Sequence, residues 1–149
     1  MSDADLPPDT PHGLRQLRKM MGSGTGAPIA QTLGFTLTRA EPGAVTFEGE
    51  PTRSVYNPIG TVHGGYAATL LDSACGCAVH SRLEEGQGYT TLELKVAYHR
   101  ALHDGARVRA EGRVVTMGRR AAFAEATLVD EEGRLCASAT STLLVMAAR

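Results

Sequence analysis

Hydrophobic positions along the chain recur with two different periods, and these periods predict where helices and strands lie. Helical spacing occurs over 14–21 and again from Gly64 to about Leu83. In the second stretch, one apolar stripe is formed by Ala67, Leu70, Leu71, Ala74 and Ala78. Alternation of apolar and polar positions is typical of strands, and it covers residues 35–47, with a turn at 41–43, and residues 92–98, 108–114, 122–128 and 135–145.

The connections between the predicted strands are short and contain glycine, as at 103–105, 117–118 and 130–133. Connections of this length join antiparallel neighbours. The sequence therefore predicts an α+β fold, in which one long helix covers one face of a five- or six-stranded antiparallel sheet. One helix leaves the edges and the other face of such a sheet uncovered, so we expect dimerisation through a sheet edge.

The first 30 residues differ in composition from the rest of the chain. Residues 1–11 are rich in proline and aspartate and are expected to form a mobile tail. The short helix over 14–21 follows, and a stretch of glycine and serine at 22–26 is expected to be a linker. The predicted organisation is a tail with a short helix at 1–30 and a single domain at 31–149.

The overall composition excludes several classes of protein. Of the 149 residues, 42% are hydrophobic and 21% are charged, which is typical of a folded domain. Fifteen basic and sixteen acidic residues give a net charge of −1, so no basic field favours nucleic acid as a partner. The sequence has neither an apolar run of about 18 residues nor a signal peptide, which predicts a cytoplasmic protein without a membrane segment.

The cysteines and histidines give no support for redox or metal chemistry. The three cysteines are an odd number, and we interpret them as small buried hydrophobic residues. His63, Asp72 and His80 are separated by nine and eight residues, so Asp72 and His80 would lie about 12 Å apart along a helix. These side chains cannot share an ion, and we expect neither a metal nor another cofactor.

The start of the long predicted helix carries residues suited to chemistry. Asn57 and His63 precede Gly64 and Gly65, and the first amides of a helix have no acceptor within it. Two glycines let a ligand oxygen approach these amides closely, which is the arrangement of an oxyanion site. The alternative is that the glycines only fit a tight junction between loop and helix.

Asp72 is the second candidate, because no other Asp, Glu, Lys or Arg occurs between Gly64 and Ser81. Solvated helix faces are usually rich in Lys and Glu. The residues on its flank are instead small, namely Gly65, Ala68, Thr69 and Gly76. This pattern predicts that a partner subunit or a ligand packs there; the alternative is an ordinary solvated face.

The spacing of these residues resembles a known family. The run Asn57…Gly60-x-x-His63-Gly64-Gly65…Leu71-Asp72-x-Ala74 is similar to the signature of the hotdog-fold acyl-CoA thioesterases, in the phenylacetate-pathway (PaaI-like) branch. The stretch from Thr91 to Arg100 and the stretches at 114–120 and 130–137 resemble the later strands of that family. Ala97 and Ala101 depart from the Asn and Pro that the family often has, at a strand end and a turn.

The resemblance implies a fold and a role for each candidate residue. The hotdog fold wraps its sheet around one long helix, and two subunits form the active site between them. Gly64 would then polarise the thioester carbonyl through its amide, beside Gly65 in the substrate site. His63 and Asn57 would hold the loop and help to position the thioester or a water molecule.

The resemblance also implies roles for a residue of the second subunit and for residues that bind coenzyme A. Asp72 from the other subunit would be the nucleophile or the general base, and Thr91, with Thr90 as the alternative, would orient the water. Arg119 and Arg120 resemble a basic turn near the nucleotide end of coenzyme A; the alternative is a solvated hairpin turn.

The implied function is hydrolysis of an aryl- or fatty-acyl-CoA thioester to free acid and coenzyme A. The enzyme would work without a cofactor, as a homodimer or as a tetramer of two dimers. Two other functions stay open: a hotdog hydratase or dehydratase, and a non-catalytic acyl-CoA-binding protein. The residues do not specify the acyl group.

Overall fold

The structure is a computed structural model that describes residues 5–147. Part of the expected mobile tail, residues 1–4, lies outside the described residues. Two carbonyl groups within residues 5–11 accept hydrogen bonds from Arg15. Its Nη2 donates to the Pro7 carbonyl at 2.7 Å, and its Nε donates to the Thr10 carbonyl at 3.1 Å. This part of the N-terminal segment is therefore held against the first turns of the following helix.

The described residues form three α-helices, one short 3₁₀ turn and six strands. The helices are α1 (His12–Ser23), α2 (Pro28–Leu33) and α3 (Gly64–His80), and the 3₁₀ turn is Arg53–Val55. The strands are β1 (Phe35–Glu41), β2 (Ala44–Gly49), β3 (Gln87–Tyr98), β4 (Val108–Met117), β5 (Ala121–Asp130) and β6 (Leu135–Ala147).

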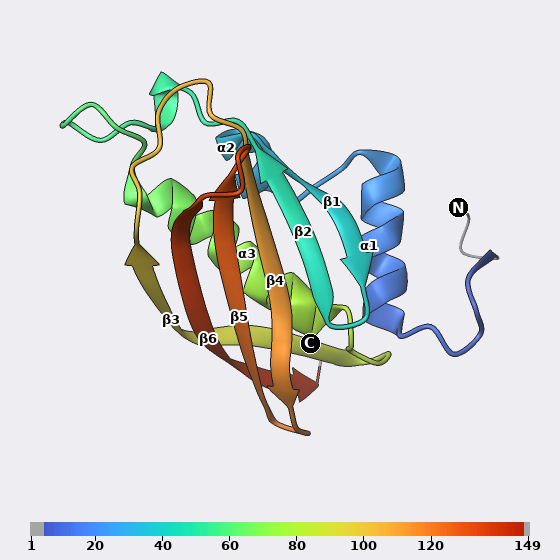
Figure 1. The fold of residues 1–149 in the computed structure, drawn as a ribbon. Helices are drawn as coiled ribbons and strands as arrows, with labels where there is room; N and C mark the ends of the chain where they lie inside the picture. The colour runs from blue at the N-terminus through green and yellow to red at the C-terminus, as the bar shows by residue number, and fades with distance from the viewer. Residues whose placement is uncertain (1–4, 148–149) are drawn as a thin grey trace.

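All six strands belong to one antiparallel sheet in the order β1-β2-β4-β5-β6-β3. The sheet curves around α3, which crosses behind the strands in Figure 1, while α1 lies beside β1 at the sheet's end. This is the predicted architecture of one long helix against a six-stranded antiparallel sheet. Strands β1 and β3 form the two edges of the sheet.

The core lies between α3 and the concave face of the sheet. The predicted apolar stripe of α3 is buried, and Leu70, Leu71 and Ala74 have no exposed surface. Gly112 of β4 permits this close packing, because a Cβ atom there would overlap with the Ala74 carbonyl group. A glycine in this strand is therefore required by the approach of the helix backbone.

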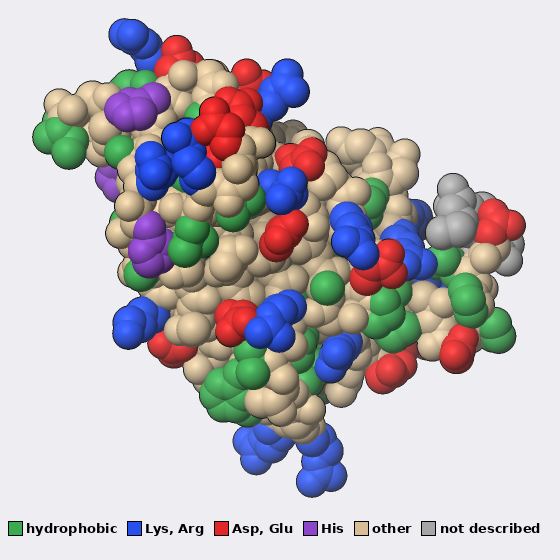
Figure 2. All heavy atoms as spheres, viewed as in Figure 1, with side chains coloured by type: hydrophobic (Ala, Val, Ile, Leu, Met, Phe, Trp, Pro, Cys, Tyr) green, Lys and Arg blue, Asp and Glu red, His purple; other side chains and the backbone are tan. Residues whose placement is uncertain are grey.

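The outer face of the sheet carries charged side chains of both signs over the strands (Figure 2). Arg109 and Glu111 form an ion pair of 2.8 Å along β4, and Arg113 of the same strand pairs with Glu125 of β5. Outward residues alternate with buried ones along β4. The alternation that predicted these strands therefore reflects one buried and one solvated face.

Strand β3 contains a β-bulge that the sequence pattern did not reveal. Its register against β6 shifts between Thr91 and Glu93, which leaves Leu92 as the extra residue. Alternation predicted that Leu92 would face inward, and this was wrong, because its side chain is 59% exposed. The bulge changes which residues of β3 face the helix before and after position 92.

The ends of two predicted elements also differ in the structure. Helix α3 ends at His80 rather than near Leu83, because the Ser81 hydroxyl donates to the Ala78 carbonyl and accepts from the Gly43 amide at 2.7 Å. Strand β3 begins at Gln87, five residues earlier than predicted. Helix α2 was not predicted, since six residues are too few to show a helical period.

Helix α1 packs onto the sheet and onto the end of α3. Leu14 and Leu17 are buried in the core, and the Gly13 amide donates to the Leu83 carbonyl at 2.9 Å. The predicted division between residues 30 and 31 falls inside α2. We keep 31–149 as the proposed extent of the hotdog domain, with α1 packed against it.

Candidate active site

The loop before α3 is shaped by the side chain of Asn57. Its Oδ1 accepts hydrogen bonds from the amides of Ile59 and Thr61, both at 3.1 Å, and its Nδ2 donates to Thr61 Oγ1 at 2.8 Å. The His63 amide donates to the Val55 carbonyl at 2.8 Å, which closes the loop. Asn57 therefore fixes the turn that delivers His63 to the start of the helix.

His63 is the N-cap of α3. Its Nδ1 accepts a hydrogen bond from the Gly65 amide at 2.7 Å, which satisfies one of the orphan donors of the helix. An accepting Nδ1 places the proton of the neutral ring on Nε2, and the ring is exposed. The amide of Gly65 is thus engaged within the chain.

The Gly64 amide has no acceptor among residues 5–147, so it is the helix donor that is open to a ligand. The Gly64 carbonyl accepts a hydrogen bond from the Tyr98 hydroxyl at 2.7 Å. A Cβ atom at position 64 would lie 2.9 Å from the tip of the Tyr98 ring, so this glycine also fits beneath a side chain. The predicted alternatives, an oxyanion donor and a junction residue, are therefore compatible.

A cavity of about 400 Å³ lies beside the Gly64 amide. Its lining includes Asn57, His63, Gly64, Tyr98 and Arg100. Tyr98 is the last residue of β3, and Arg100 lies in the loop after it. Neither was a predicted site residue, although both occur in the stretch that carried the family resemblance.

Asp72 is half-buried on α3 and is held by a residue of β3. Thr91 Oγ1 donates a hydrogen bond to Asp72 Oδ1 at 3.0 Å, whereas Thr90 is exposed on the other face of the strand. Of the two threonines considered from the sequence, the structure brings Thr91 to the carboxylate. Asp72 also lies at the rim of a second cavity, of about 390 Å³.

Part of the small-residue flank beside Asp72 is filled by the chain itself. A Cβ atom on Gly76 would lie 2.5 Å from the Tyr89 hydroxyl, so Tyr89 of β3 occupies this space. The expectation that a partner or ligand packs at Gly76 is therefore wrong, because periodicity alone did not show that an aromatic side chain from β3 covers it. Thr69 forms a hydrogen bond within the helix, from Oγ1 to the Gly65 carbonyl at 2.8 Å.

The two candidate chemical groups lie too far apart to act on one carbonyl within one chain. Asp72 follows Gly64 by eight residues on the same helix, which is about 12 Å along its axis. An oxyanion donor and a base must both lie about 3 Å from the reacting atoms. Within one chain, the Gly64 amide and the Asp72 carboxylate therefore cannot both contact the same thioester carbonyl.

A comparison with protein families decides what these residues belong to. A family model for the thioesterase superfamily matches residues 59–137, more than half of the chain, and this range includes Gly64, Asp72 and Thr91. The chain belongs to the thioesterase superfamily. The activity that the sequence predicted, hydrolysis of a thioester, is thereby confirmed.

Individual thioesterases support the same assignment. The proofreading thioesterase EntH of Klebsiella pneumoniae subsp. pneumoniae is 35% identical over 104 residues, which are 70% of this chain and 75% of EntH. A mutant of the phenylacetic acid degradation protein PaaI from Thermus thermophilus has a TM-score of 0.74 at 32% identity, over 79% of this chain and 98% of PaaI. The predicted hotdog fold and PaaI-like resemblance are confirmed.

A third relative is seen with a ligand. The protein smu.793 from Streptococcus mutans UA159, whose structure is bound to acetyl CoA, has a TM-score of 0.72 at 28% identity. The superposition covers 78% of this thioesterase and 91% of smu.793.

The cysteines of this thioesterase are unsuited to act as nucleophiles. Cys75 is buried, and Cys77 lines the cavity beside Asp72. Burial, and then the negative charge of Asp72, raises the pKa of both thiols to about 12. Both therefore remain protonated at neutral pH, and the reactive thiolate is absent.

Two of the predicted substrate-binding residues lie in one exposed turn. Arg119 and Arg120 lie exposed in the turn between β4 and β5, and neither forms an ion pair with any residue that the structure describes.

No group of His, Cys, Asp or Glu within 5–147 is arranged to hold a metal ion, and no described helix is long and apolar enough to cross a membrane.

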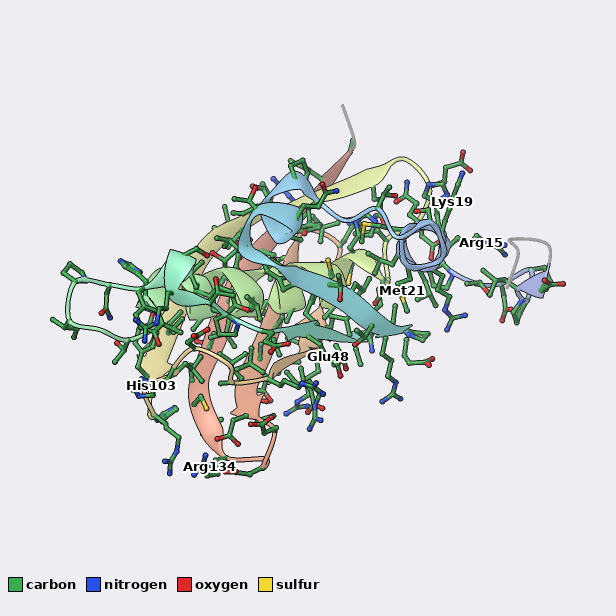
Figure 3. The ribbon with its side chains drawn as sticks, turned by 90° about the horizontal axis from the view of Figure 1, so that it is seen from above. Arg15, Lys19, Met21, Glu48, His103 and Arg134 are labelled. Atoms are coloured by element: carbon green, nitrogen blue, oxygen red, sulfur yellow. The ribbon has the colours of Figure 1, made fainter. Side chains whose placement is uncertain are left out.

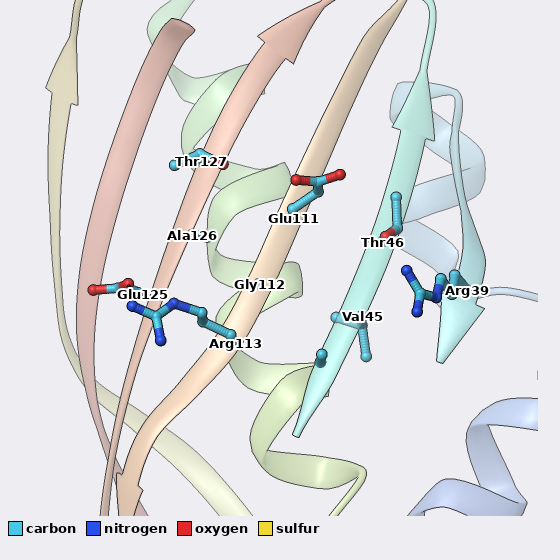
Figure 4. Close-up of a pocket in the computed structure, with 10 residues that line it drawn as sticks. Arg39, Val45, Thr46, Glu111, Gly112, Arg113, Glu125, Ala126 and Thr127 are labelled. Atoms are coloured by element: carbon cyan, nitrogen blue, oxygen red, sulfur yellow. Dashed lines mark ion pairs between the residues drawn. The ribbon is translucent and has the colours of Figure 1, made fainter. Parts of the chain in front are cut away.

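The outer face of the sheet has a hollow of about 360 Å³ (Figure 4). Its floor is formed by Gly112 and Ala126, and Arg113 and Glu125 pair across its rim. It lies on the opposite side of the sheet from α3 and contains none of the predicted site residues.

Proposed function

We propose that this thioesterase hydrolyses acyl-CoA thioesters in a site formed by two subunits, with Gly64 from one and Asp72 from the other. One observation carries the proposal: an open amide and a threonine-held carboxylate lie on one helix, about 12 Å apart. Two antiparallel copies of α3, related by a two-fold axis, would place each amide opposite the other subunit's carboxylate.

In the proposed mechanism, Asp72 acts as a general base. Its Oδ1 accepts from Thr91, so Oδ2 and the threonine oxygen are left to hold a water molecule. As Asp72 takes a proton from this water, the water oxygen bonds to the thioester carbonyl carbon. The carbonyl oxygen becomes an oxyanion and accepts from the Gly64 amide, and the C–S bond then breaks to release coenzyme A as its thiolate.

The loop residues serve this chemistry indirectly. Asn57 holds the turn and His63 caps the helix, so together they aim the Gly64 amide at the cavity that Tyr98 borders. Gly65, whose amide is engaged by His63, is exposed and is the proposed substrate contact next to Gly64; a Cβ atom there would lie 2.9 Å from His63 Nδ1.

Coenzyme A is the proposed carrier, as in the acetyl CoA complex of smu.793. The exposed and unpaired guanidinium groups of Arg119 and Arg120 are suited to its phosphates. The proposed assembly is a homodimer, or a tetramer of two dimers, and the 12-residue strand β3 is a free sheet edge at which subunits can join. We propose a cytoplasmic location for it.

The substitution Asp72→Asn tests the catalytic assignment. We expect kcat to fall by about 10²–10⁴, because the base is lost while the shape is kept. KM should change little and the particle mass not at all. Glu131→Gln, which neutralises an exposed carboxylate in the turn between β5 and β6, is the matched control.

The assay also separates the other functions considered. Release of free coenzyme A without an enoyl or hydroxyacyl product identifies hydrolysis, whereas a hydratase or a binding protein releases none. Wild-type kcat for Asp72→Asn in an intact oligomer contradicts the proposed base. A single turnover in ¹⁸O-labelled water that places the label in the Asp72 carboxylate identifies a nucleophile instead of a base.

A further inference from the structure

The cavity at Asp72 has an apolar lining that the catalytic proposal does not use. Its volume is about 390 Å³, and it extends from the carboxylate between α3 and the strands β1 and β2. Phe35, Leu37 and Phe47 form one side of it. A pocket of this size, mostly apolar and with few polar groups, is typical of a small-molecule site.

One side of this cavity is rigid. The rings of Phe35 and Phe47 pack edge to face with centroids 5.7 Å apart, and both side chains are buried. Tyr89 is wedged against Gly76, where even one added carbon atom would overlap with its hydroxyl. The contact between Phe35 and Phe47 therefore fixes this side of the cavity, and Tyr89 fixes the end next to Asp72.

The opposite wall is adaptable and comes from the N-terminal segment. Met20 and Met21 of α1 line the cavity, together with the exposed stretch from Gly24 to Ala27 that leads to α2. Figure 3 shows Met21 on the side of α1 that faces the sheet, with Lys19 on the opposite side. Methionine is unbranched and flexible, so it fills an irregular gap and adjusts to what lies in it.

This wall lies outside the part of the chain that matches the thioesterase superfamily, which starts at residue 59. The carboxylate is thus provided by the matched part of the chain, whereas the apolar sides of the adjoining cavity are provided by residues 20–27 and by Phe35, Leu37 and Phe47, which precede it. Such a division allows the reaction to stay the same while the size of the accepted substrate changes.

We propose that this cavity holds the acyl group of the substrate, and that Met20 and Met21 set the length of acyl chain that the thioesterase accepts. The inference rests on the proposed function, because the carbonyl must lie at Asp72 for the acyl group to enter here. The lining selects an uncharged alkyl group, since a charged acyl group would be buried against Phe35 and Leu37 without a partner.

The test compares saturated acyl-CoA substrates of increasing length with wild type, Met20→Ala, Met21→Ala and Met21→Phe. For wild type, kcat/KM should rise about fourfold with each methylene buried, and then stop rising where the chain meets the methionines. Each alanine variant should move this limit to longer chains by about three methylenes, because it removes three chain atoms, Cγ, Sδ and Cε. Met21→Phe should leave kcat for short-chain substrates unchanged and lower kcat/KM for the substrates with the longest acyl chains.

The control is Met146→Ala, which shortens a partly exposed methionine on β6 outside the cavity and should leave the profile unchanged. Thermal unfolding and particle mass establish that each variant is folded and assembled. If all variants hydrolyse acyl-CoA with one common length limit, the acyl-pocket inference is wrong while the proposed function stands. If wild type hydrolyses an aryl-CoA but none of these saturated substrates, the acyl-pocket inference is likewise wrong; if it hydrolyses no acyl-CoA of either kind, the proposed function itself fails.

Discussion

At the scale of single residues, one hydrogen bond orients the candidate catalytic carboxylate. Thr91 donates to Asp72 from a neighbouring strand, so the carboxylate is oriented by a side chain whose own position is fixed by the sheet. A group held in this way loses little conformational freedom when the reaction begins. Thr91 is thus a positioning residue whose contribution can be measured separately from that of the carboxylate.

We predict that Thr91→Val lowers kcat by about 10- to 100-fold, the value of a hydrogen bond to a charged group. Valine keeps the shape of threonine and removes only the hydroxyl. Thr90→Val is the matched control, since Thr90 is exposed on the other face of β3. Steady-state kinetics with both variants checks this, and equal losses for the two would contradict the assignment of Thr91.

The sequence predicted most of the candidate residues but not what surrounds them. His63, Gly64 and Asp72 could be selected because a helix N-terminus and an isolated carboxylate have chemical meaning without tertiary structure. Tyr89 and Tyr98 could not, because their contacts with Gly76 and Gly64 join positions that are far apart along the chain. Their only signal was their place in an alternating pattern, which they share with ordinary core residues.

At the scale of elements, α1 and the end of α3 form a joint that contains a titratable group. His80 Nε2 and Gln16 Oε1 are 2.8 Å apart across the two helices. Burial, and then the nearby charge of His12, lowers the pKa of His80 below its usual value of 6.5. The unfolded chain therefore takes up a proton at a higher pH than the folded one.

This difference predicts that stability falls as the pH decreases below about 6.5, the usual histidine value, until the folded His80 is itself protonated. The stabilisation is fully present above that pH, where His80 is neutral in both states. Thermal unfolding at pH 7.5 and pH 5.5 checks the prediction: wild type should lose more in Tm than His80→Gln over this interval. An equal loss in both proteins would show that other groups dominate.

Prediction of the elements failed where local geometry departs from the regular periods. The long helix and the strand pairs followed from their apolar positions, and Ala122, Ala124 and Leu128 are buried as alternation required. The start of β3 was missed because the alternating signal is interrupted at Leu92. In β4 the alternation ends at Val115, since the register shifts between Val114 and Thr116 and both Val115 and Thr116 are exposed.

At the scale of the whole molecule, the spacing of Gly64 and Asp72 makes the assembly part of the chemistry. Mixed dimers test this. One partner carries two substitutions. Gly64→Pro removes the donor amide at a helix position that tolerates proline, and Tyr98→Ala makes room for the proline ring. The other partner carries Asp72→Asn together with Tyr98→Ala, so that Tyr98→Ala alone is the control for both.

We expect each defective protein to be nearly inactive and a co-refolded equal mixture to regain about a quarter of the control activity. Half of the dimers are then mixed, and each mixed dimer has one site with both groups intact and one with neither. Kinetics and light scattering on the same sample check this, with dimers or tetramers expected from the 15.7 kDa chain. An inactive mixture of assembled dimers would contradict a shared site.

The bulge in β3 has a consequence for how this protein tolerates insertions and deletions. Before it, Tyr89 and Thr91 face the helix, and after it Leu94 and Tyr98 do, so the two groups occupy opposite parities of the residue numbering. Because Leu92 and Glu93 both lie on the exposed face, removing Leu92 would restore strict alternation and leave both groups facing the helix. A single-residue deletion at position 92 is therefore expected to be tolerated better than a deletion elsewhere in β3, where one of the two groups would lose its place against the helix.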